Sequence, residues 1–165
     1  MAGLQNDSSY TIFRAGDSNV ELARKAVAEV HGRAQVKHAQ VSEFLRNSSH
    51  YLLLALYEER VVGSLMGYRL QHPHCAESQF LLYEIDVLRE CRNRGIGKAL
   101  IERFIREAQD AGAFEVWVLT NRSNEAAMKM YARCGLRQQH RDDVMLSLML
   151  NKKGNPPDRE LNKRG

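Results

Sequence analysis

The segment from Arg92 to Lys98 has the composition of an anion-binding turn. Gly95 and Gly97 allow a tight backbone bend that exposes consecutive N–H groups, and the apolar spacing that follows predicts a helix over 98–111. The start of a helix adds unpaired N–H donors and the positive end of its dipole. With basic side chains on both flanks, the turn is suited to a pyrophosphate. An isolated Gly-x-Gly fits a plain turn with solvated arginines better, so the pattern needs support from elsewhere in the chain.

Three other side chains are of types that exchange protons with an amine or a thiolate. Glu84 and Asp86 share one face of a predicted strand by its two-residue period. A carboxylate there can bind an ammonium ion and then accept its proton. Tyr131 lies near the end of a predicted helix, and a phenol with an ordinary pKa of about 10 holds a proton at neutral pH. Taken alone, Glu84 fits a cross-strand salt bridge equally well, and Tyr131 fits a core aromatic residue.

The elements that must position these residues follow from apolar periodicity and turn signals. The chain order is one strand, two helices, three strands, a helix, a strand, a helix and two closing strands. The crossover from Leu81 to Leu119 is strand–helix–strand, which makes its two strands parallel. Gly63 and Gly67 lie inside a strand and indicate bulging or close packing. The predicted strands are 10–14, 51–57, 61–70, 79–88, 114–120, 136–138 and 144–150, and the predicted helices are 17–30, 41–46, 98–111 and 124–133.

Composition and charge exclude several classes of protein. The 165 residues, 44% hydrophobic and 27% charged, suit one mixed α/β domain over 1–150. The net charge of +4 comes mostly from 151–165, a tail with five basic and two acidic residues that we expect to be flexible. The sequence shows no basic face with aromatic support, so nucleic-acid binding is not expected. No apolar segment is long enough to cross a membrane. Three widely spaced cysteines and six histidines predict no metal site, and the absence of a leader pattern predicts a cytoplasmic protein.

Two motifs together resemble the acetyl-CoA signature of the GNAT superfamily of N-acetyltransferases. The first is Arg92-Asn93-Arg94-Gly95-Ile96-Gly97, which fits the pattern Arg/Gln-x-x-Gly-x-Gly/Ala. The second is Asn124-Glu125-Ala126-Ala127, followed by Tyr131 and by Cys134-Gly135-Leu136, with leucine where the family has phenylalanine. The resemblance spans roughly residues 10–150.

This resemblance implies an α/β (α+β) fold, with a mixed central sheet of about six to seven strands flanked by about four helices. It implies acetyl-CoA as the donor and CoA as a product, with direct transfer between the two bound substrates. A bulge near Val87 is also implied, because the family splays this strand from its neighbour, and the freed Val87 amide would polarise the acetyl carbonyl. Glu84 is implied as the base and Tyr131 as the acid. The residues implied to bind acetyl-CoA are Ile85, Asp86, Val87, Arg92, Asn93, Arg94, Gly95, Ile96, Gly97, Lys98, Asn124 and Tyr131.

A narrower resemblance is to the type I aminoglycoside 3-N-acetyltransferases. It rests on residues 79–90, on 115–136 and on 141–148. These proteins carry a tyrosine–acid pair before the phosphate turn and an acidic pair before the last strand. The implied acceptor is the 3-amino group of an aminoglycoside, a small polycation, as in antibiotic resistance, and a homodimer is compatible with the family. The residues implied to bind the acceptor are Tyr83, Glu84, Asp142 and Asp143, although local sequence alone makes the last two a solvated hairpin turn.

Two alternatives stay open at this point. An acetyltransferase of the same family could act on a polyamine, an amino acid or a protein N-terminus. A non-catalytic CoA-binding domain would keep the turn over 92–98 but could dispense with Glu84 and Tyr131, so the presence of both favours an enzyme.

Overall fold

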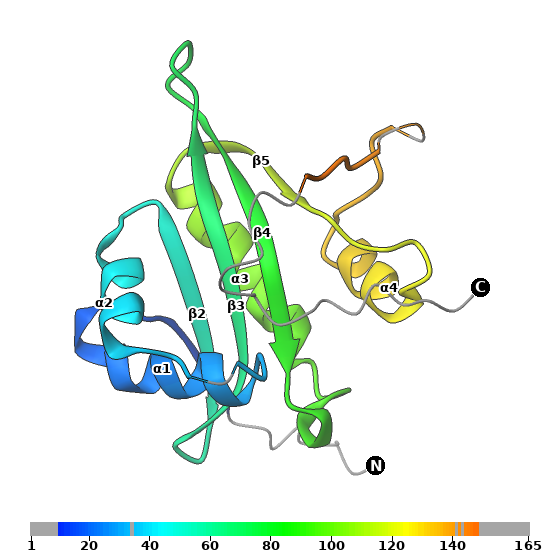
Figure 1. The fold of residues 1–165 in the computed structure, drawn as a ribbon. Coiled ribbons are helices and arrows are strands. Elements are labelled where there is room, and N and C mark those ends of the chain that lie inside the picture. Colours follow the sequence, from blue (N-terminus) through cyan, green and yellow to red (C-terminus); the bar gives the residue numbers. More distant parts are fainter. Residues whose placement is uncertain (1–9, 34, 141, 143, 149–165) are drawn as a thin grey trace, which may run out of the picture.

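A mixed five-stranded sheet with helices on both faces forms the body of the molecule (Figure 1). The computed structural model describes residues 10–33, 35–140, 142 and 144–148. The strand order follows the chain order, with antiparallel pairing up to β4 and parallel pairing between β4 and β5. In chain order the elements are β1 (Thr11–Arg14), the 3-10 turn Asp17–Asn19, α1 (Val20–Glu29), α2 (His38–Arg46), β2 (His50–Tyr57), β3 (Arg60–Gln71), β4 (Ser78–Val87), the 3-10 turn Arg89–Cys91, α3 (Ile96–Asp110), β5 (Ala113–Val118) and α4 (Glu125–Arg133).

Strand β2 separates two hydrophobic cores. Leu53 and Ala55 join the cluster packed under α3, whereas Leu52 and Leu54 join the cluster under α1 and α2. A strand covered on both faces reads as a continuous apolar run rather than as an alternating one. This explains the sequence of β2, in which residues 51–55 are all buried.

Helix α3 carries the chain from β4 back to β5 and lies against the sheet at a glycine. A Cβ atom on Gly67 would lie 2.3 Å from Cζ of Phe104 and 2.9 Å from the carbonyl oxygen of Leu81. The Phe104 ring therefore occupies the space that a side chain on β3 would need. The predicted close packing at Gly67 and the parallel crossover are both confirmed.

The predicted count of six to seven strands was too high for the described part of the chain. Residues 136–138 and 144–148 carry no strand, and residues 149–150 lie outside the described residues. A strand needs a neighbour to pair with its backbone, and 144–148 has none here, with Leu146 90% exposed. No described helix combines the length and the hydrophobicity that crossing a bilayer requires.

Candidate active site

Strand β4 contains one residue more than its partner requires. The register of β3 and β4 pairs Gly67 with Leu82 and then Met66 with Glu84, so Tyr83 is left without an opposite residue. Such a bulge shifts the alternation of side chains by one position.

The bulge decides which way the two carboxylates point. Before it, Leu82 is buried in the cluster under α3. After it, Ile85 and Val87 pack against that same cluster. Glu84 and Asp86 therefore lie on the opposite face of the sheet, beside the segment that follows α1. If the alternation continued unbroken from Leu82, Glu84 would share the face of Leu82.

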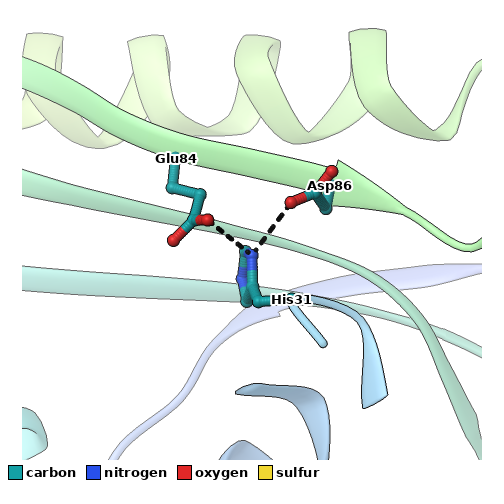
Figure 2. A group of neighbouring side chains, drawn as sticks. All are labelled: His31, Glu84 and Asp86. Carbon is teal, nitrogen blue, oxygen red and sulfur yellow. Dashed lines mark hydrogen bonds and ion pairs between the residues drawn. The ribbon is translucent and has the colours of Figure 1, made fainter. Parts of the chain in front are cut away.

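A buried histidine meets both carboxylates on that face (Figure 2). His31 Nδ1 lies 3.2 Å from Asp86 Oδ2 and 3.6 Å from Glu84 Oε1. Its other nitrogen, Nε2, lies 2.6 Å from Oγ of Ser64, which is fully buried on β3. The His31 side chain is only 2% exposed, so the imidazole joins the end of α1 to β3 and β4.

The surroundings of His31 favour its charged form. Burial alone lowers the pKa of a histidine, but here the hydrogen bonds to Asp86 and Glu84 and their negative charges outweigh it and raise the pKa of His31 to about 9. At neutral pH the ring is therefore an imidazolium, which donates from Nδ1 to the carboxylates and from Nε2 to Ser64.

A second cation shares the Glu84 carboxylate. Arg33 Nη2 donates to Glu84 Oε1 at 3.2 Å. His31, Glu84 and Asp86 have the composition of a metal site, since one ligand atom from each lies within 4.8 Å of the others. A cation there would compete with the Arg33 guanidinium and the His31 proton for the same oxygens. The described side chains thus already balance two negative charges with two positive ones.

Strands β4 and β5 separate beside these residues. Their parallel register ends at Leu82 and Val118, whereas β4 continues to Val87. Within the described residues, 85–87 therefore pairs only with β3, which leaves one backbone edge of β4 open towards β5. The predicted bulge near Val87 was wrong in position, because the register of 84–87 is regular and the extra residue is Tyr83.

The glycine turn lies directly after the end of β4. Asn93 and Gly95 have φ angles of 61° and 81°, and Gly95 is the N-cap of α3. The left-handed conformation at Gly95 turns the chain sharply into the helix, as glycine allows. A Cβ atom on Gly97 would lie 2.9 Å from Sδ of Met130, so the start of α3 touches α4 closely. The first turn of α3 therefore packs against the helix that follows β5.

The charged residues of the turn have specific partners. Arg92 Nε donates to the carbonyl oxygen of Val87 at 3.0 Å, which ties the turn to the end of β4. Lys98 Nζ lies 2.6 Å from Glu102 Oε1, and this contact raises the pKa of Lys98. Arg94 is exposed, whereas the Ile96 side chain is buried in the core, so only the backbone of Ile96 can face a ligand.

Helix α4 supplies the predicted acid. Tyr131 is buried, and burial together with the negative charge of Asp86 raises its pKa. Asn124 accepts a hydrogen bond from the amide of Ala127 at 3.2 Å, as an N-cap residue does. Both residues therefore have a structural role, and their roles in binding and catalysis stay predictions.

The predicted acceptor residues are only partly described. Tyr83 is 48% exposed, and its ring meets Tyr68 edge-on with centroids 5.5 Å apart. Asp142 is exposed in a turn, and Asp143 lies outside the described residues. The role of the acidic pair therefore stays a prediction.

Sequence reasoning missed His31, Arg33 and Ser64. Ser64 gave a usable signal, because a lone hydroxyl within the apolar run of β3 requires a hydrogen-bond partner when buried. Nothing in the spacing of His31 and Arg33 indicated their own partners, since the two carboxylates lie on a strand more than 50 residues later.

The sequence profile described as the Acetyltransferase (GNAT) family matches residues 17–136, most of the chain. The chain belongs to this family. Among its relatives, human N-acetyltransferase 8B is 32% identical over 81 residues, which is 49% of this chain and 36% of that protein. The match covers only 36% to 64% of the length of the most similar curated relatives.

Two solved structures share the GNAT fold of this chain. One is an aminoglycoside acetyltransferase from an uncultured soil metagenomic sample, in complex with sisomicin, with a TM-score of 0.75 at 21% identity. It covers 89% of this chain and all of its own. The other is the aminoglycoside N-acetyltransferase AAC(6′)-Iy in complex with CoA, with a TM-score of 0.71 at 21% identity, covering 87% and 97% of the two chains.

Proposed function

We propose that this protein is an acetyl-CoA-dependent N-acetyltransferase that acts on a small cationic amine. The observation that carries the proposal is the opening between β4 and β5, with the glycine turn at its end and the Glu84 carboxylate on β4 beside it. This arrangement offers a donor site and a proton acceptor on the same strand. Membership of the GNAT family supports acetyl-CoA as the donor, as does the CoA bound to a protein of the same fold.

The donor is held mainly by backbone groups in this proposal. The amides at the start of α3, with Gly95 as N-cap, bind the pyrophosphate. Asn93, Arg94 and Lys98 border it, while Arg92 fixes the turn to Val87. The open edge over 85–87 pairs with the pantetheine arm as a strand would, and the Val87 amide polarises the acetyl carbonyl.

Two side chains move the protons. Glu84 binds the ammonium and accepts its proton, directly or through water. The amine nitrogen then bonds to the acetyl carbon, and the bond between that carbon and sulfur breaks. Tyr131, whose pKa is raised, keeps its proton at neutral pH and donates it to the departing thiolate. No covalent bond to the protein is needed.

An aminoglycoside is the preferred acceptor in this proposal. Glu84 and Asp86 lie side by side and bind cationic side chains, which suits them to ammonium groups, and structural relatives act on aminoglycosides. The sequence resemblance favours the 3-amino group, with Asp142 and Asp143 as further contacts. A polyamine, an amino acid or a protein N-terminus is the alternative acceptor. The name of the human relative, N-acetyltransferase 8B, specifies no acceptor.

The test is thiol release from acetyl-CoA with sisomicin, gentamicin, spermidine and a short peptide, for the wild type and for Glu84→Gln. Release with sisomicin that falls at least a hundredfold in Glu84→Gln supports the proposal, and NMR of the product identifies the acetylated nitrogen. Release with spermidine or peptide alone replaces the acceptor. No release with any amine, while CoA binds, overturns the enzymatic function in favour of a CoA-binding domain.

A further inference from the structure

The Glu84 carboxylate, which the proposed function assigns to the acceptor, carries two protein cations of different kinds on one oxygen. Glu84 Oε1 lies 3.6 Å from His31 Nδ1 and 3.2 Å from Arg33 Nη2. The imidazole is 2% exposed, whereas the Arg33 side chain is 29% exposed. One cation is thus behind the carboxylate, and the other reaches it from the solvent side.

His31 is a fixed counter-ion. Its two ring nitrogens are bonded at the same time, one to Ser64 on β3 and the other to Asp86 on β4. Displacing the ring would leave the buried Ser64 hydroxyl without its partner and take a cation away from Asp86 and Glu84, which is costly inside the protein.

Arg33 is an exchangeable counter-ion by contrast. Gly32, with a φ of 62°, turns the chain between the two residues so that both reach the same carboxylate. Arg33 then lies between α1 and α2, where the described residues form no helix or strand, and its long side chain is partly solvated. This part-buried ion pair is screened less by salt than a fully exposed one. Unlike the enclosed His31, however, its guanidinium can exchange with a dissolved cation from the solvent side.

We infer that Arg33 is a specificity residue, an internal cation that the acceptor's ammonium group must displace from Glu84. The inference rests on the proposed function, because it assumes that Glu84 receives the acceptor. An alkyl ammonium that reaches Glu84 from solvent competes with the partly solvated guanidinium for this carboxylate. The exchange replaces one cation by another, so the charge of the site is conserved while His31 stays in place. Acceptors with further ammonium groups displace Arg33 better, because their remaining charges add to the attraction.

Arg33→Gln tests the exchange, with Arg60→Gln as the matched control. Arg60, the first residue of β3, forms an ion pair of similar length with Glu90 in the 3-10 turn after β4, so removing it leaves the contacts of Glu84 in place. Steady-state kinetics with sisomicin are measured at low salt and with 0.3 M NaCl, and sisomicin binding in the presence of CoA is measured by calorimetry. Circular dichroism checks that each variant is folded.

We expect Arg33→Gln to lower the sisomicin KM and dissociation constant about two- to fivefold at low salt. The acetyl-CoA KM should stay unchanged, and Arg60→Gln should match the wild type in its sisomicin KM and dissociation constant. An unchanged or higher sisomicin KM in Arg33→Gln overturns the inference and leaves the proposed function standing. Tighter sisomicin binding by Arg33→Gln without thiol release from either protein would keep the exchange and overturn the enzymatic function. Absence of both binding and release overturns both.

Discussion

Tyr131 combines burial with a charged neighbour in a way that preserves its proton. Its ring is part of the core under α3, and the negative charge of Asp86 acts on its hydroxyl group. Both effects raise the pKa of Tyr131, since each disfavours a phenolate. A raised pKa suits a group that must remain protonated until a stronger base, such as a departing thiolate, forms beside it.

Replacing Tyr131 with phenylalanine removes that proton and little else. We expect the kcat to fall about a hundredfold, because general acid catalysis typically contributes that much or more, while CoA binding changes by less than about threefold. Thiol-release kinetics and calorimetry measure the two quantities. An unchanged kcat would remove Tyr131 from the proton-transfer step and leave it as a core residue.

At the scale of elements, the sheet and α3 meet without any gap at Gly67. The Phe104 ring lies where a β-carbon would stand, and the carbonyl oxygen of Leu81 closes the other side. Backbone cannot move aside as a flexible side chain can, so even one methyl group must distort the contact between β3 and α3.

Gly67→Ala should therefore lower the free energy of unfolding by about 1–3 kcal/mol. Gly16→Ala is the control, because a Cβ there has no neighbour within 4 Å, and its φ of −138° suits alanine. Urea denaturation measures both, and Phe104→Leu should recover part of the loss in the Gly67→Ala background. Equal stabilities of the two alanine variants would contradict the packing argument.

Much of this arrangement follows from the sequence. Apolar periodicity predicts the α3 helix and the parallel crossover, and the residue types predict the glycine turn. The phase of β4 was also readable, since its apolar positions change from Phe80 and Leu82 to Ile85 and Val87. The absence of a strand over 144–148 could not be predicted. Apolar alternation indicates that a segment suits a sheet, but not whether a neighbouring strand is there to pair with it.

The candidate site was only half predictable for a related physical reason. Glu84 and Tyr131 lie on regular elements whose faces can be counted. His31 and Arg33 follow the end of α1 and reach Glu84 across more than 50 residues of sequence. Contacts of that range depend on how the helix docks against the sheet, which local pattern does not encode.

At the scale of the molecule, the ion network joins parts of the chain that are far apart in sequence. His31 connects the end of α1 to Ser64 on β3 and to Asp86 on β4. The helices on that face of the sheet are therefore held to the central strands by charge as well as by apolar packing (Figure 1). Stability should consequently depend on the protonation of one imidazole.

The pH dependence has a definite direction. The pKa of His31 rises from an ordinary 6.5 to about 9 on folding, so its contribution is fully present below pH 6.5 and is lost as the pH rises through 9. Relative to His31→Gln, the wild type should lose about 3 kcal/mol of unfolding free energy between pH 6 and pH 10. Urea denaturation across that range measures it, with His38→Gln, an exposed histidine at the start of α2, as the control. Parallel curves for the wild type and His31→Gln would contradict the network.

The extra residue in β4 makes a deletion at Tyr83 unlike a deletion elsewhere in the strand. Its ring is half exposed, so many substitutions there should fold normally. Losing the residue altogether would place Glu84 directly after Leu82, and plain alternation would then keep Glu84 on its present face and Ile85 against the core. Losing Ile85 instead would turn Asp86 towards the apolar side chains. A library of single-residue deletions should therefore score Tyr83 as the more tolerant of these two positions.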